Sequence, residues 1–126
     1  YAMVIGAGQS LNMSSSLFQK SLLEMKYLTK YFNGKETTVE SLAGVGDLYV
    51  SAAGGRNSKM GDYLGKGFTF KSAKKKFMFK DTVEGEQLVR EIGPFIFKKI
   101  NLQKIPLMIN LLRSLLKNKK LNLKKL

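Results

Sequence analysis

The sequence contains neither cysteine nor histidine. Without cysteine it can form no disulfide and no thiolate metal site, and without histidine it has no imidazole to act as a general base or zinc ligand. Any chemistry must therefore use amine, guanidinium, carboxylate, hydroxyl or amide side chains. We predict that there is no metal site. Because nothing indicates an oxidising compartment, we also expect a cytoplasmic location.

Long apolar runs are also missing. A helix that spans a bilayer needs roughly 20 consecutive apolar residues, whereas the best run, residues 107–116, is interrupted by Asn110, Arg113 and Ser114. We therefore expect no membrane span. No signal peptide is visible, and because the chain begins with Tyr1 rather than methionine, we expect its natural start to lie upstream.

Acidic residues are scarce, with 9 Asp and Glu against 22 Lys and Arg, a formal net charge of +13. Such a charge can serve nucleic acids or anionic membranes. However, 19 of the basic residues are lysines and only 3 are arginines, and arginine is the better anion reader because of its planar fork. We interpret most of the excess as solvated surface and expect no nucleic-acid partner.

The alternative hypothesis is a basic helical module that binds nucleic acid or an anionic surface. It predicts that seven basic residues near the C-terminus form one face, namely Lys98, Lys99, Lys104, Arg113, Lys117, Lys119 and Lys120. Its binding would weaken steeply as the salt concentration rises.

At 126 residues the chain has the length of one domain. Hydrophobic periodicity and capping signals predict an all-α fold. The expected helices cover residues 14–32, 37–42 with a capping box at Thr37, 57–64, 70–77 after a Thr69 cap, 84–100 and 106–116. The short piece at residues 48–50 could be a strand or two helical turns.

Several details follow from turn chemistry. Asn33-Gly34 should end the first long helix. Gly93-Pro94 predicts a kink or break inside residues 84–100. Residues 118–126 should form a basic, frayed tail after a domain that ends near residue 117. The phenylalanines of the lysine-rich stretch, Phe68, Phe70, Phe77 and Phe79, are expected to anchor a core rather than to stack on single-stranded nucleic acid.

The opening AMVIGAG, residues 2–8, looks like a strand that enters a phosphate-binding turn. A dinucleotide fingerprint requires a third glycine where Leu11 stands, and a second strand with an acidic residue at its end. Residues 33–43 supply no such strand. We therefore predict that these small residues let a helix approach its neighbour closely.

The stretch AGVGDLYVSAAGGRNSK, residues 43–59, carries the chemistry. Arg56 offers a fork for a phosphate or carboxylate, and Asn57 can both donate and accept hydrogen bonds. Ser51 adds a small hydroxyl and Asp47 a lone carboxylate. A purely structural alternative is that Asp47 caps a helix, Arg56 is its surface ion-pair partner, and the glycines form turns.

GVGDL followed by GGRN resembles the signature of the NAD(P)-dependent glycerol-3-phosphate dehydrogenases, in their C-terminal helical substrate domain. Residues 57–61, the VEG at 83–85 and the KIPL at 104–107 extend the resemblance over residues 1–117. The spacing from Asp47 to Arg56 is similar to that of the eukaryotic-type enzymes. The implied fold is the helical domain shared with 6-phosphogluconate dehydrogenase-like proteins.

The resemblance implies hydride transfer between NAD or NADP and dihydroxyacetone phosphate, giving sn-glycerol 3-phosphate. It implies that Asp47 orients a catalytic lysine, expected just before Tyr1, or bonds the substrate's hydroxyl end. It also implies that Arg56 and Asn57 grip the phosphate, that Ser51 lies in the substrate site, and that Arg56, Glu84 and Thr82 touch the cofactor. We expect Asp47, Ser51, Arg56 and Asn57 to face one concave pocket.

The resemblance also implies two partners, an N-terminal Rossmann domain that this chain lacks and a second copy of the chain in a homodimer. The chain by itself is then expected neither to turn over substrate nor to bind NAD(P) appreciably. A related but inactive dimerisation domain is a further hypothesis, which the Arg56-Asn57 pair argues against, since that pair suits phosphate binding.

Overall fold

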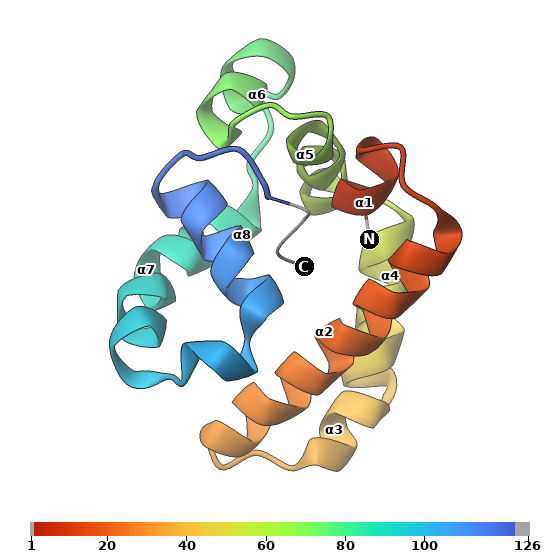
Figure 1. The fold of residues 1–126 in the computed structure, drawn as a ribbon, viewed down its shortest axis with the longest axis vertical. Helices are drawn as coiled ribbons and strands as arrows, with labels where there is room; N and C mark the ends of the chain where they lie inside the picture. The colour runs from red at the N-terminus through yellow and green to blue at the C-terminus, as the bar shows by residue number, and fades with distance from the viewer. Residues whose placement is uncertain (1, 123–126) are drawn as a thin grey trace.

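The computed structural model describes residues 2–122, and these residues form helices and loops without any strand (Figure 1). The helices are α1 (Ala2–Gly6), α2 (Leu11–Tyr31), α3 (Glu36–Glu40), the π-helix η1 (Leu42–Gly46), α4 (Asp47–Ala53), α5 (Arg56–Gly65), α6 (Phe70–Phe77), α7 (Glu84–Lys99), the 3₁₀ helix η2 (Leu102–Lys104) and α8 (Pro106–Leu116). The all-α prediction is confirmed. Residues 48–50, for which both a strand and helical turns were considered, are helical.

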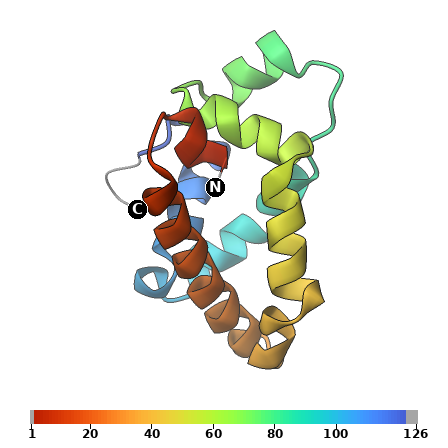
Figure 2. The ribbon, with the colours of Figure 1, turned by 90° about the vertical axis from the view of Figure 1, so that its right-hand side faces the viewer.

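The long helix α2 forms one side of the molecule. α3 packs against its C-terminal end, and the chain then returns through α4 to α5, which lies against α1 (Figure 2). α7 and α8 pack against each other on the other side, and α8 also contacts α2. Segments from both ends of the chain thus share one fold.

Local capping explains where α2 and α6 begin and end. The Ser10 hydroxyl accepts a hydrogen bond from the Met13 amide, so α2 starts three residues before the predicted residue 14. After α2, Asn33 adopts a left-handed φ of 59°, as the Asn33-Gly34 stop predicts. The predicted Thr69 cap is also confirmed, because its hydroxyl accepts from the Ser72 amide.

The predicted capping box at Thr37 is wrong. α3 begins at Glu36 after Lys35, whose side chain makes no capping hydrogen bond. Ser41 takes the capping role instead, because its hydroxyl accepts from the Ala43 amide at 3.3 Å and donates to the Thr38 carbonyl at 2.7 Å. The short helix therefore ends at a serine that starts the next helical turn.

Two clusters of buried side chains form the core. The first contains Met60, Leu64, Phe70, Ala73, Met78 and Val83, and the second contains Val89, Ile96, Ile100, Ile105, Ile109 and Leu112. Phe70 is buried, and Phe68 and Phe77 pack against the first cluster as predicted. The prediction for Phe79 is wrong: its side chain is 70% exposed, because the preceding Met78 turns inward after α6 ends.

Glycines bring α1 and α5 into close contact. A Cβ atom at Gly6 would lie 2.2 Å from the Asp62 carbonyl oxygen, and one at Gly65 would lie 2.0 Å from the Met3 carbonyl oxygen. Both distances are far below van der Waals contact, so only glycine permits this approach. The opening GAG is therefore part of a helix-packing contact and not of a nucleotide loop.

α7 continues from Glu84 to Lys99 through Pro94, so the break that Gly93-Pro94 could have caused does not occur. The buried Gly93 faces α8, where an added Cβ would lie 2.7 Å from a Leu116 methyl carbon. This glycine thus lets the two last helices pack closely.

The start of α8 is capped from α2. Pro106 occupies the first position, as predicted, and lacks an amide hydrogen. The Glu24 carboxylate accepts hydrogen bonds from the Leu107 amide at 2.6 Å and the Met108 amide at 2.9 Å. Because Glu24 is only 7% exposed, this carboxylate belongs to the interior of the fold.

The segment after α8 folds back onto the domain. The Ser114 hydroxyl donates to the Lys119 carbonyl at 2.9 Å, and the Asn110 side-chain amide donates to the Asn122 carbonyl at 2.6 Å. The Asn118 side chain accepts from the Lys71 amide of α6 at 2.9 Å. The prediction of a frayed tail is therefore wrong for residues 118–122. Its remainder, residues 123–126, lies outside the described residues.

Candidate functional site

Two glycines between α4 and α5 set the direction in which α5 begins. Gly54-Gly55 separates α4 from α5, and Gly55 has a φ of 93°, which an L side chain rarely adopts. Arg56 and Asn57 follow directly as the first two residues of α5. The glycines therefore determine the direction in which these two polar side chains leave the backbone.

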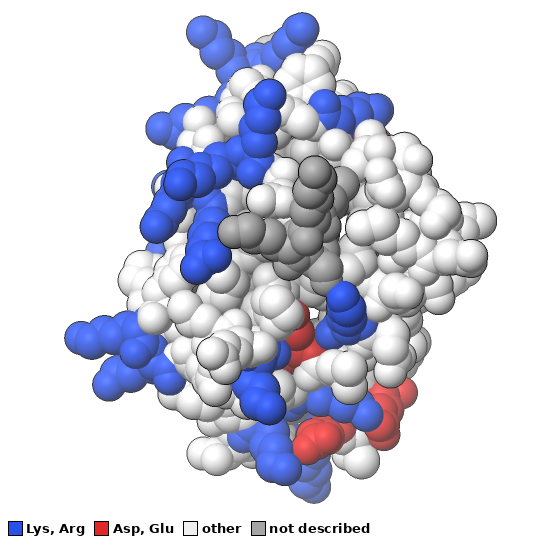
Figure 3. All heavy atoms as spheres, viewed as in Figure 1, with Lys and Arg blue, Asp and Glu red and all other residues white. Residues whose placement is uncertain are grey.

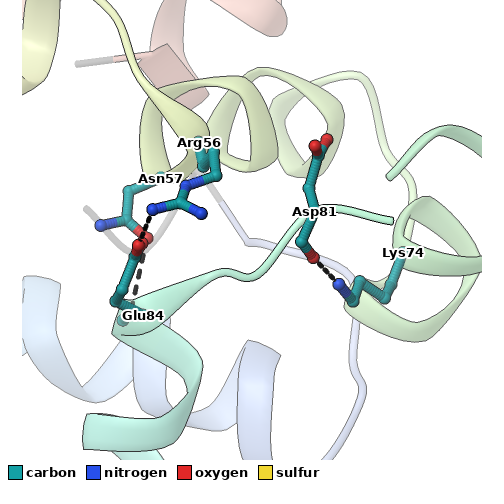
Figure 4. Close-up of polar contacts among 6 residues, drawn as sticks. Arg56, Asn57, Lys74, Asp81 and Glu84 are labelled. Atoms are coloured by element: carbon teal, nitrogen blue, oxygen red, sulfur yellow. Dashed lines mark hydrogen bonds and ion pairs between the residues drawn. The ribbon is translucent and has the colours of Figure 1, made fainter. Parts of the chain in front are cut away.

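Arg56 and Asn57 both bind the start of α7 (Figure 4). The Arg56 guanidinium forms an ion pair with the Glu84 carboxylate, and the Asn57 side-chain oxygen accepts from the Gly85 amide at 3.3 Å. Just over half of each charged side chain is exposed, 53% for Arg56 and 55% for Glu84. A carboxylate at the first position of a helix is also favoured by the helix dipole.

The loop before α7 is anchored at Asp81. Its carboxylate lies 3.4 Å from the Lys59 ammonium of α5. Its carbonyl accepts a hydrogen bond from the Lys74 ammonium of α6, as Figure 4 shows. The exposed Thr82 lies in the chain between Asp81 and Glu84. These contacts hold the segment that presents Glu84 to Arg56.

The predicted site residues divide into two groups. Arg56 pairs with Glu84 and Asn57 binds the neighbouring Gly85 amide, whereas Asp47 and Ser51 lie on exposed positions of α4. The structural alternative in which Asp47 pairs with Arg56 is wrong, because the ion-pair partner of Arg56 is Glu84. Asp47 is instead the first residue of α4, where a carboxylate is favourable.

Three hollows of the described chain are lined by residues other than Asp47, Ser51, Arg56 and Asn57. An apolar hollow of about 280 Å³ lies between α1, α2, α4 and α8 and includes Leu48 and Glu24. A second hollow lies along α8, between η2 and the segment that follows α8. A third lies between α2, α3 and η1. A pocket shared by Asp47, Ser51, Arg56 and Asn57 stays a prediction.

Glu24 was not singled out by sequence reasoning. Burial raises the pKa of its carboxyl, although the Met108 and Leu107 amides and the charge of Lys20 act in the opposite direction. The sequence does contain a signal, since Glu24 lies seven residues after the buried Leu17 and so falls on the inner face of α2.

The basic residues lie mainly over α6, α7 and α8, whereas the acidic side chains visible in the same view lie near α2 and α3 (Figure 3). Of the seven residues of the predicted basic face, Arg113, Lys117, Lys119 and Lys120 line the hollow after α8. Lys98, Lys99 and Lys104 do not line that hollow. The predicted basic face is therefore only partly present, since four of its seven residues line one hollow.

A family model described as the NAD-dependent glycerol-3-phosphate dehydrogenase C-terminus matches residues 1–123. The chain belongs to this family. Its all-α fold agrees with that membership, and nothing in the comparisons favours a nucleic-acid-binding module. The extent of the match exceeds residues 1–117, over which the sequence motifs were recognised.

Similar proteins carry matching names. The chain is 32% identical over 108 residues to the glycerol-3-phosphate dehydrogenase [NAD(+)] of Candida tropicalis, which is 82% of this chain and 28% of that enzyme. It is 39% identical over 72 residues to glycerol-3-phosphate dehydrogenase [NAD(P)+] 2 of Lactobacillus delbrueckii subsp. bulgaricus. That alignment covers 56% of this chain and 21% of that enzyme. The chain thus spans less than a third of the length of either relative.

The described residues contain neither a candidate membrane-spanning helix nor a candidate metal-binding cluster. Among residues 2–122, no helix is both long and apolar enough to cross a membrane, as the interrupted run at residues 107–116 predicted. The same part of the chain holds no group of three or more acidic side chains close enough to bind a metal ion.

Proposed function

We propose that the chain is the substrate domain of an enzyme that interconverts dihydroxyacetone phosphate and sn-glycerol 3-phosphate with NAD(P)H. Family membership supports the reaction class, and the names of the relatives support the substrate and the cofactor. The observation that carries the proposal within this chain is the constellation of Arg56 and Asn57 with Glu84 and Gly85.

Arg56 and Asn57 are proposed to bind the substrate phosphate. The guanidinium offers several parallel donors, of which the contact with Glu84 uses only some, so others remain for phosphate oxygens. Both side chains start α5, where backbone amides and the helix dipole favour an anion. Glu84 then serves as a positioning residue, since it holds the guanidinium in one orientation before substrate arrives.

Asp47 and Ser51 are proposed to face the other end of the substrate from α4. They stand one helical turn apart, so both side chains can point to the same side of that helix. Both are exposed in this chain. The proposal therefore requires a second surface, supplied by an N-terminal nucleotide-binding domain, to close the site over them and to bring a lysine to Asp47.

The exposed residues also fit a dinucleotide. The Arg56 guanidinium suits a pyrophosphate, and the Glu84 carboxylate and Thr82 hydroxyl suit ribose hydroxyls. The cofactor, when bound, supplies the hydride. The residues of this chain would bind and orient the ketone, and Asp47 would hold the acid that protonates the developing alkoxide.

The experiment joins residues 1–126 to the nucleotide-binding part of the Candida tropicalis relative and follows dihydroxyacetone phosphate-dependent NADH oxidation. We expect turnover by the chimera and none by the isolated chain. Arg56→Gln should raise KM for dihydroxyacetone phosphate about tenfold or more, because a charge-assisted phosphate contact is lost. Lys75→Gln, an equal charge change on α6, is the control. A folded chimera that binds NADH yet leaves the ketone unreduced would refute the proposal.

We extend the proposal to a cytoplasmic homodimer. The proposed substrate and cofactor are both intracellular metabolites, which supports a location inside the cell, and within the cell we propose the cytoplasm. For the dimer, Tyr31, Phe32 and Phe95 form an exposed aromatic cluster with ring centroids 5.2 to 6.4 Å apart. Exposed aromatic clusters of this kind favour protein contacts. Sedimentation of the chain should give a dimer that Phe95→Ser dissociates, and a monomeric wild type would exclude this interface.

A further inference from the structure

A basic hollow lies along α8, apart from the residues proposed to bind substrate. It has a volume of about 680 Å³, and its cations are Arg113, Lys117, Lys119 and Lys120. The α8 residues that line it follow helical spacing and therefore form one stripe, which comprises Pro106, Ile109, Asn110, Arg113 and Ser114, and Lys117 continues it directly after the helix.

Hydrogen bonds build the far wall of this hollow. The wall is the segment at residues 117–122, and the Ser114 hydroxyl and Asn110 amide hold its Lys119 and Asn122 carbonyls. Ser114 is only 1% exposed, so its hydroxyl is committed to this contact. The backbone between the two tethers carries Lys119 and Lys120. The cations thus occupy a concave surface and do not stand on a free tail.

No acid neutralises these four cations within the described part of the chain. Its ion pairs use Lys26, Lys30, Arg56, Lys59, Lys66 and Arg90, all of which precede α8. Residues 92–126 contain no acidic residue at all. Four positive charges around one hollow repel each other, and an anion bound between them would relieve that repulsion.

We propose that this hollow binds a small anion that carries several phosphates. Its volume lies within the range of small-molecule sites, roughly 300 to 1,000 Å³. A single phosphate carries at most about two negative charges at neutral pH, fewer than the four cations offer. A chain of three or more phosphates matches that number. Three of the cations are lysines, which bind phosphates as point charges.

The test measures inorganic tripolyphosphate binding to the chain by calorimetry at about 0.1 M salt, where exposed charges still interact over roughly 10 Å. We expect one saturable site with a dissociation constant at least about tenfold lower than that of orthophosphate. The triple variant Lys117→Gln, Lys119→Gln and Lys120→Gln should weaken binding about tenfold or more, because three of four cations are lost.

Matched variants separate the hollow from mere charge. Lys75→Gln, Lys76→Gln and Lys80→Gln together remove the same charge from α6 and the turn after it, and should change the affinity less than about twofold. Ser114→Ala removes no charge but releases the wall, so it should weaken binding. Asn110→Ala releases the second tether and serves if Ser114→Ala does not fold.

Three results would overturn the proposal. The first is the absence of saturable tripolyphosphate binding up to millimolar concentration. The second is an equal loss in the two triple variants, which would indicate that only net charge matters. The third is binding to duplex DNA that strengthens with duplex length and is untouched by Ser114→Ala, which would indicate a polyelectrolyte surface in place of a small-molecule site.

Discussion

The rings of Tyr63 and Phe77 stack face to face, with centroids 4.4 Å apart and planes inclined by only 11°. Phe68 meets both rings edge-on, at 6.3 Å from Tyr63 and 5.1 Å from Phe77. Tyr63 belongs to α5 and Phe77 to α6, so this stack joins the helix that carries Arg56 to the helix that follows it.

Phe77→Ala should lower the free energy of unfolding by about 2 to 3 kcal/mol, since it removes the stack and the packing against the first core cluster. Phe79→Ala is the matched control, because the same side chain two residues later is mostly exposed, and its change should stay within about 0.5 kcal/mol. Urea unfolding followed by circular dichroism measures both. Equal effects at the two positions would contradict the packing.

Gly65→Ala should destabilise the fold by about 1 to 3 kcal/mol, because its methyl group would overlap the Met3 carbonyl oxygen and push α1 from α5. Gly54→Ala is the control: nothing lies within 4 Å of a Cβ there, and its φ of 179° is extended backbone. We expect Gly54→Ala to leave the thermal midpoint nearly unchanged. A stable Gly65→Ala protein with native α1–α5 contacts would show that the close approach is unnecessary.

Glu24→Ala should cost about 2 to 4 kcal/mol, since it leaves two amides of α8 without their acceptor and opens a gap in the interior. Glu24→Gln retains one acceptor oxygen and should cost less. For comparison, the exposed Glu91 can be changed to alanine with an effect within about 0.5 kcal/mol. Urea unfolding of the three variants gives the order. A Glu24→Ala protein as stable as Glu91→Ala would exclude the capping role.

The stability of the fold should also depend on pH through Glu24. Because burial raises the pKa of its carboxyl, the folded chain keeps a proton at pH values where the unfolded chain has lost it. The contribution of Glu24 to the free energy of unfolding is therefore greatest below the ordinary glutamate pKa and falls as the pH rises through the raised value.

Glu24→Gln has no such ionisation and supplies the comparison. The stability of the wild type relative to Glu24→Gln should decline as the pH rises above the ordinary pKa of glutamate, about 4.3, and through the raised value. Urea unfolding at several pH values measures that difference. A difference that grows with pH would mean that the two amide hydrogen bonds outweigh burial and lower the pKa.

Local signals in the sequence were sufficient for most of the helices. Thr69 and Asn33 act on backbone groups within a few residues of themselves, so the position of each signal is also the position of its effect. The Ser10 cap is equally local but was overlooked, so the predicted start of α2 was three residues late. The Thr37 capping box failed because α3 begins at Glu36, which places Thr37 inside the helix, and the serine cap at Ser41 belongs to the next helix. Phe79 failed because the direction of a side chain after a helix end depends on the tertiary packing.

Contacts between distant segments were beyond the sequence. Glu24 and Leu107 are separated by 83 positions and Arg56 and Glu84 by 28, and no pattern within one helix indicates that such residues pair. The motif resemblance did identify Arg56, Asn57 and Glu84 as functional candidates. It did not predict the contacts of Arg56 with Glu84 and of Asn57 with Gly85. Nor did it predict that residues 118–122 would be hydrogen-bonded to Asn110, Ser114 and the Lys71 amide.

The cap on α8 also limits how this domain can recognise phosphate. Helix starts commonly hold phosphate through free amides, yet Pro106 has no amide hydrogen and the next two amides are saturated by an internal carboxylate. An incoming anion near α8 must therefore depend on mobile side-chain ammonium and guanidinium groups rather than on fixed backbone dipoles. Ionic strength, more than backbone geometry, would then govern how tightly that end of the molecule retains its anions.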